Sequence, residues 1–254
     1  MDFIIHSTIL LINNNGRMKE GFMLNFFDEN GNFLINDFIN SERIIMLQWE
    51  NQETIKNMSG KDLIDRYSLY MCHINDEIKE AYDADTLEDF FKEVIDISMY
   101  IASVANLFKI KAESIFGNDL NSLINEQAII DSYKDKKTWK MSYNDLSGDI
   151  TIKLSSIRES FPQRKWHKNA VNFETGEFLF VLTKSYVTCI NMIYSIINFL
   201  MNRCLNDTFY INRIINIKQN KIVNVAKNTG TNTNAVVIKE LVQLSNEIEE
   251  GLIL

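Results

Sequence analysis

Residues 75–96 read NDEIKEAYDADTLEDFFKEVID, a stretch that predicts two helices separated by a short break at 83–85. Ser59 is suited to cap the first helix and Thr86 to begin the second. Because the break is short, we expect an antiparallel hairpin. On both helices the apolar positions recur at steps of three and four, the spacing of one helix face. They are Leu63, Ile64, Tyr67, Tyr70, Met71, Ile74, Ile78 and Tyr82 on the first, and Leu87, Phe90, Phe91, Val94, Ile95, Ile97, Met99, Ile101, Val104 and Leu107 on the second.

The composition of the whole chain favours the same all-α fold class. The 254 residues include one proline and nine glycines, which is too few for the turns of a β-sandwich or barrel. Hydrophobic residues make up 46% of the chain, which is typical of a globular protein and excludes wholesale disorder. The net charge of −8 disfavours a polynucleotide partner, because binding a phosphate backbone needs clustered Lys and Arg.

The distribution of polar and apolar residues suggests an N-terminal arm followed by one helical domain. We expect the arm at 1–40, as a small β-element or irregular segment, and a single domain at 41–254. Within this domain, 41–116 carries the helical hairpin, 117–150 is a polar connector, and 151–254 is a second helical half with a similar layout.

Local signals predict where further elements begin and end. Ser41 is suited to cap the first helix, a separate helix is expected from Lys109, and Gly148 is expected to interrupt the connector. Asn and Gly clusters at 13–16 and 28–31 predict turns. Further helices are expected over about 177–204, 207–227 and 235–250.

Cysteines and apolar runs indicate the compartment. Three cysteines and three histidines show no spacing typical of a disulfide framework or a zinc site. No basic segment precedes the first apolar run, so a signal peptide is not expected. The longest apolar stretch, 186–201, is shorter than a bilayer span and contains two asparagines. We therefore expect a buried helix there, no membrane association and a cytoplasmic protein.

Two pairs of acidic residues are the most informative chemical feature. Glu77 and Glu80 are three residues apart on the first helix of the hairpin, and Glu93 and Asp96 are three apart on the second. Residues at this spacing share a helix face, so both pairs can converge. Four adjacent carboxylates do not all stay ionised without cations, and hard oxygen ligands select Mg²⁺ or Mn²⁺. Most such pairs are solvated surface, but the second pair here is embedded among apolar residues, where a charge needs compensation.

The pattern ExxE, twelve residues and ExxD resembles the metal-binding signature of the all-α nucleoside triphosphate pyrophosphatases, a superfamily that includes the MazG-like proteins and the dimeric dUTPases. LQWEN at 47–51 resembles the first-helix pattern with which this family contacts base and sugar. KQNKIVNVAKN at 218–228 resembles the late helix that grips the phosphates. The three segments occur in the family's order and span about residues 44–230.

The resemblance implies a helical bundle of this type and a homodimer. It implies hydrolysis of a deoxynucleoside triphosphate, dUTP first and dCTP second, to the monophosphate and pyrophosphate by a metal-activated water. The cofactor would be Mg²⁺, with Mn²⁺ as a substitute, and Glu77 would orient or deprotonate the water. The implied metal ligands are Glu77, Glu80, Glu93 and Asp96, and the implied substrate contacts are Gln48, Asn51, Lys221, Asn224 and Lys227, with Lys218 as an alternative to Lys221.

Two alternatives from other functional classes stay open. Dimeric dUTPases usually carry a Trp/Lys-rich segment soon after ExxE, whereas 81–89 is short and acidic. This difference favours a catalytically inactive helical scaffold that binds a protein partner. The basic segment RKWHK at 164–168 is the basis of a weaker alternative, a nucleic-acid binder, which the net charge disfavours.

Overall fold

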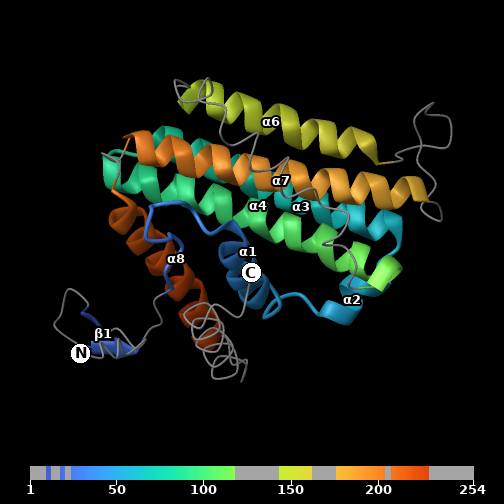
Figure 1. Ribbon diagram of the computed structural model, residues 1–254, viewed down its shortest axis with the longest axis horizontal. Helices are drawn as coiled ribbons and strands as arrows, with labels where there is room; N and C mark the ends of the chain where they lie inside the picture. The colour runs from blue at the N-terminus through green and yellow to red at the C-terminus, as the bar shows by residue number, and fades with distance from the viewer. Residues whose placement is uncertain are drawn as a thin grey trace. The chain divides into compact units, whose positions relative to one another are not determined.

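The computed structural model describes residues 10–12, 18–20, 24–117, 143–161, 176–203 and 207–228 (Figure 1). Helices dominate these residues, so the predicted all-α class is confirmed. The strands in the described part are β1 (Leu10–Ile12) and β2 (Met18–Glu20), an antiparallel pair with Leu11 opposite Lys19. The chain divides into two compact units. Unit 1 comprises Met1–Trp49 and Asp207–Leu254, and unit 2 comprises Glu50–Asn206.

Unit 1 is built on helices α1 (Ile35–Met46) and α8 (Thr208–Asn228), which pack against each other (Figure 1). A turn at 28–31 precedes α1, as predicted, and is closed by a hydrogen bond from the Gly31 N–H to the Asp28 carbonyl. Gly31 adopts a φ of +78°, which costs little only for a residue without a Cβ. The turn brings Phe27 opposite Phe33, where their rings lie 5.3 Å apart in the core.

Asparagines on α8 hold the backbone of the segment before this turn. Asn216 accepts a hydrogen bond from the Leu24 N–H at 2.7 Å and donates one to the Leu24 carbonyl at 2.9 Å. Asn212 likewise accepts from the Phe26 N–H at 2.9 Å and donates to Leu24 at 3.0 Å. Both amides are buried, so they satisfy backbone groups that water does not reach. We call these two residues the asparagine clamp.

Helix α1 begins at Ile35, six residues before the predicted cap at Ser41, so that prediction is wrong. Ser41 is fully buried; its hydroxyl donates to the Phe38 carbonyl and accepts from Gln219 on α8, both at 2.8 Å. Ser41 therefore lies inside α1 with its hydroxyl satisfied twice, by the Phe38 carbonyl one turn earlier and by Gln219 on α8. The predicted boundary at 40/41 consequently falls within α1.

Unit 2 contains α2 (Gln52–Asn57), α3 (Gly60–Asp83), α4 (Leu87–Phe116), α6 (Tyr143–Ser160) and α7 (Gly176–Arg203). The four long helices lie side by side, with α4 against α3 and α7, and α6 against the same two helices (Figure 1). The buried Tyr67 ties α3 to α6, because its hydroxyl donates to the Leu154 carbonyl at 2.7 Å. Its ring lies 5.6 Å from that of Phe108 on α4.

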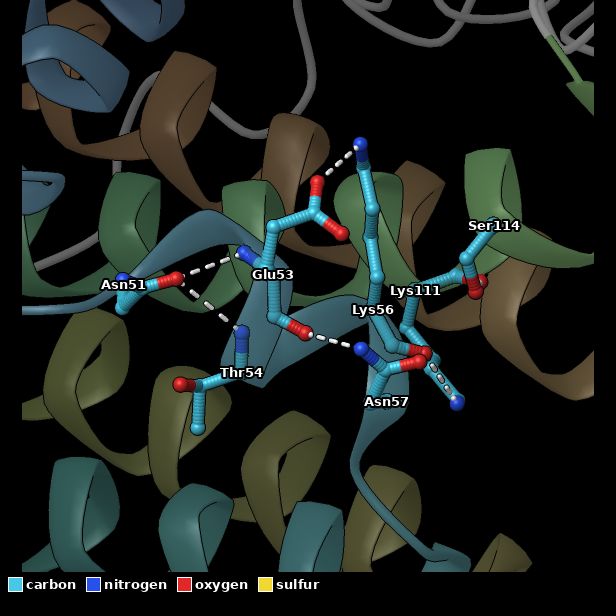
Figure 2. Close-up of polar contacts among 7 residues, drawn as sticks. All are labelled: Asn51, Glu53, Thr54, Lys56, Asn57, Lys111 and Ser114. Atoms are coloured by element: carbon cyan, nitrogen blue, oxygen red, sulfur yellow. Dashed lines mark hydrogen bonds and ion pairs between the residues drawn. The ribbon is translucent and has the colours of Figure 1, made fainter.

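Two predicted breaks in unit 2 are absent from the structure. Helix α4 runs unbroken through Lys109, where a new helix was expected. In this region Lys111 donates to the Lys56 carbonyl at the end of α2, at 2.8 Å (Figure 2). Helix α6 includes Gly148, whose surroundings have room for a Cβ and place no demand on a glycine. The predicted helix at 235–250 and the RKWHK segment at 164–168 lie outside the described residues.

Helix α7 contains the apolar stretch 186–201 that the sequence predicts to be a buried helix. By length and composition alone, Gly176–Met201 would suffice to cross a membrane. In unit 2 this helix packs on α4 and α6, and 56% of its most apolar segment is buried. The packing agrees with the predicted buried helix.

Candidate metal centre

In the hairpin of α3 and α4, a side-chain cap fixes the first residue of each helix. The Ser59 hydroxyl accepts from the Asp62 N–H, and the Asp62 carboxylate accepts from the Ser59 N–H in return. Thr86 caps α4 by accepting from the Asp89 N–H at 3.0 Å. Helix α3 ends at Asp83, so both predicted caps and the predicted break are confirmed. The short connection brings the end of α3 next to the start of α4.

Three of the four predicted carboxylates meet in this hairpin. Oxygens of Glu77 and Glu80 on α3 and of Glu93 on α4 all lie within 4.8 Å of one another, a grouping able to hold a metal ion. Glu80 is exposed, whereas Glu77 and Glu93 are partly buried. Asp96 is outside this group of three, but it is close enough to act electrostatically on Glu77. We call Glu77, Glu80, Glu93 and Asp96 the carboxylate cluster.

Glu77 is a member of the cluster with a strongly raised pKa. Burial raises its pKa from 4.5 to about 8, and the negative charges of Asp96 and Glu80 add to this rise, followed by a hydrogen bond to Glu93. One oxygen of Glu77, Oε2, is shielded from solvent and has no hydrogen-bond partner. A buried acceptor without a partner is costly, and a cation would remove that cost.

Lysines close to the cluster in sequence form ion pairs with other acids. Lys79 contacts Asp83 at 3.1 Å, one turn along α3. Lys92 contacts Glu88 at 3.0 Å and Asp89 at 3.1 Å at the start of α4. These pairs are directed toward the hairpin connection rather than toward Glu77.

An aromatic pair borders the cluster. The rings of His73 on α3 and Tyr100 on α4 are stacked, with centroids 5.3 Å apart and planes 18° from parallel. Burial raises the pKa of Tyr100, and the charges of Glu77 and Asp96 raise it further, so its hydroxyl stays protonated at neutral pH. Sequence reasoning missed Tyr100. The available signal was that Tyr100 follows Asp96 by four residues, the same helix face.

The predicted substrate contact Asn51 is the N-cap of α2. Its Oδ1 accepts from the backbone N–H groups of Glu53 at 2.8 Å and Thr54 at 3.2 Å (Figure 2). Its side-chain oxygen is therefore engaged, which leaves the amide NH₂ for any ligand. Asn51 belongs to unit 2, as the carboxylate cluster does.

Asn51 lines an open hollow of about 810 Å³ between α2 and the first half of α3. Several polar groups of this hollow are already engaged. Asn57 donates to the Glu53 carbonyl at 2.8 Å (Figure 2), and Arg66 pairs with the nearly buried Glu50 at 3.1 Å. The lining residue nearest the cluster in sequence is Leu69, eight residues before Glu77 and about 12 Å along the helix axis. The other lining residues are Glu53, Thr54, Met58, Asp62 and Asp65.

The remaining predicted contacts belong to unit 1. Gln48 follows α1, and both polar atoms of its amide are shielded from solvent without a hydrogen-bond partner. Lys221 is exposed on α8, whereas Lys218 is 6% exposed. Asn224 and Lys227 lie within α8, but their side chains are outside the described part of the structure.

No family model, no curated protein and no solved structure matches this chain.

Proposed function

We propose that this protein is a Mg²⁺-dependent nucleoside triphosphate pyrophosphatase that prefers dUTP, with dCTP as the second choice. One observation carries the proposal: Glu77, Glu80 and Glu93 bring carboxylate oxygens from two helices to within 4.8 Å of one another. The order of the three sequence segments that resemble the all-α pyrophosphatases supports the nucleotide as substrate.

The donor set fits a hard divalent cation. Carboxylate oxygens are the ligands that Mg²⁺ and Mn²⁺ prefer, and Glu77 Oε2 is a shielded acceptor with no partner. Glu77, Glu80 and Glu93 would hold the ion, with Asp96 one helix turn from Glu93. Bound Mg²⁺ would neutralise charge on the triphosphate and lower the pKa of a water molecule. Glu77 is our choice for orienting that water, because one of its oxygens has no other partner.

Substrate contacts from Gln48, Asn51, Lys221, Asn224 and Lys227 form part of the proposal. Gln48 supports it best, because its amide has unused hydrogen-bonding capacity. Lys221 is exposed and cationic, which suits a phosphate contact. We also propose that the protein is a homodimer. Sedimentation analysis of the purified chain would measure its oligomeric state.

A panel of nucleotides tests the reaction. Purified protein with Mg²⁺ should release pyrophosphate from dUTP faster than from other dNTPs and NTPs, and EDTA should stop the release. Glu80→Gln and Glu93→Gln should each lower the rate at least about 100-fold, because each removes a charged metal ligand. Glu159→Gln is the matched control, since Glu159 is an exposed acid on α6 of the same unit. No release across the panel, or equal rates for all variants, would contradict the proposal.

The engaged oxygen of Asn51 favours a second candidate, a helical scaffold without catalysis. For a scaffold role, the carboxylate cluster would not have to bind a cation. Isothermal titration with Mg²⁺ and with a non-hydrolysable dUTP analogue separates the two candidates: a scaffold binds neither.

A further inference from the structure

The stacked pair of His73 and Tyr100 joins α3 and α4 immediately beside the carboxylate cluster. His73 precedes Glu77 by four residues, and Tyr100 follows Asp96 by four. Because α3 and α4 form a hairpin, both offsets lead away from the connection at 84–86. The stack therefore lies about one helix turn, or ~5.4 Å, beyond the cluster on the side opposite the connection.

This placement brackets the cluster between two links of different kinds. On one side the backbone connects Asp83 to Leu87 through three residues and fixes how far the helices can separate. On the other side the link is the contact between two half-buried rings. Asp96 on α4 and Glu77 on α3 repel each other when both are charged: after burial, which is the largest cause, the charge of Asp96 raises the pKa of Glu77. An attractive contact between the rings opposes that separation.

We propose that His73 and Tyr100 are positioning residues whose stack sets the spacing of α3 and α4 at the cluster, and with it the affinity for a divalent cation. Metal ligands must be held within a few tenths of an ångström of the productive geometry. A stack one turn away limits the rotation and separation of both helices at that point. This inference rests on the proposed metal site, but not on the substrate or the reaction.

Cation binding to the full chain tests the inference without any nucleotide. Free Mn²⁺ is measured by electron paramagnetic resonance during titration of wild type, His73→Leu, Tyr100→Leu and the double variant. Each Leu variant should bind Mn²⁺ about tenfold more weakly. The double variant should show the same tenfold loss rather than a hundredfold one, because either change alone removes the stack.

Conservative variants distinguish stacking from other effects. His73→Phe and Tyr100→Phe keep a ring at each position and should bind Mn²⁺ within twofold of wild type. Phe180→Leu is the matched control, because Phe180 is an exposed aromatic residue on α7 of the same unit. Circular dichroism verifies that each variant keeps its helix content. If Tyr100→Leu loses helix content, the Mn²⁺ affinity of His73→Leu tests the inference instead.

Each outcome has one meaning. Leu variants that bind Mn²⁺ as tightly as wild type overturn the positioning role and leave the proposed function in place. Phe variants that bind as weakly as the Leu variants overturn it too, because the ring would then not be what matters. A wild-type protein that binds no Mn²⁺ overturns both this inference and the metal-dependent function.

Discussion

Replacing Glu77 by Gln should stabilise the metal-free protein and at the same time abolish its binding of Mg²⁺. Glutamine has nearly the shape of a protonated glutamate and carries no charge. In the folded protein Glu77 is partly buried next to Asp96, Glu80 and Glu93, so its charged form is disfavoured there. The variant removes that unfavourable charge and also replaces one of the three carboxylates that lie together by a neutral amide, which binds Mg²⁺ far more weakly.

The size of the stability change follows from the pKa of Glu77. A pKa of 4.5 in the unfolded chain and about 8 in the folded protein means that the folded state binds the proton more tightly. The stability from this group is therefore complete below about pH 4.5 and is lost as the pH rises through 8. The full difference corresponds to about 5 kcal/mol, and solvent screening of the half-buried group reduces it to about 2 kcal/mol. Glutamine has no proton to lose and should not show this loss.

Urea unfolding at pH 5, 7 and 9 in EDTA, followed by circular dichroism, measures the effect. Glu77→Gln should be more stable than wild type by about 2 kcal/mol at pH 9 and by much less at pH 5. Exposed Glu159→Gln should stay within about 0.5 kcal/mol of wild type at every pH. Added Mg²⁺ at 100 times its Kd should stabilise wild type by about 2.7 kcal/mol and leave Glu77→Gln unchanged. The reasoning fails if the variant is less stable than wild type at pH 9 without metal, or keeps the wild-type response to Mg²⁺.

Three further predictions concern the metal and the supporting structure. Mg²⁺ affinity, measured by calorimetry, should rise between pH 6 and pH 9, because the ion displaces the proton from Glu77; a flat profile would argue against Glu77 as a ligand. Asn216→Leu should lower the free energy of unfolding by about 2–4 kcal/mol, since the buried Leu24 N–H loses its acceptor and the Leu24 carbonyl loses one of its two donors. Lys221→Ala, at an exposed position of the same helix, should change it little, and equal effects of the two variants in urea titrations would contradict the clamp. Thr86→Ala should cost about 1 kcal/mol in thermal unfolding through the lost cap, and Thr86→Ser should restore most of it.

Those parts of the fold that depend on short-range chemistry could be predicted from the sequence. Ser59 and Thr86 cap their helices through bonds to residues three positions away, and both were recognised. The three-residue spacing of Glu77 and Glu80 likewise required only helical geometry to place both side chains on one face. Once the hairpin was expected, the meeting of these residues with Glu93 followed.

Features that depend on distant partners could not be predicted in this way. Ser41 has the residue type of a helix cap, but its hydroxyl accepts from Gln219, which lies 178 residues further along the chain. Asn216, two residues before the stretch that resembles a phosphate-binding motif, binds a backbone segment 192 residues away. A single sequence gives no sign of either pairing, because residue type alone does not distinguish a buried amide that serves the backbone from one that serves a ligand.

The asparagine clamp also bears on the order in which the protein can fold during synthesis. It joins Leu24 and Phe26 to a helix made after the whole of unit 2. Unit 2 is continuous in sequence and can form as soon as residue 206 leaves the ribosome. Helix α1 must wait for α8, and its buried face, with Ser41 and Glu42, lacks its hydrogen-bond partner Gln219 until then. A nascent chain stopped before Asp207 should therefore present this face to chaperones, and one extended past Asn228 should not.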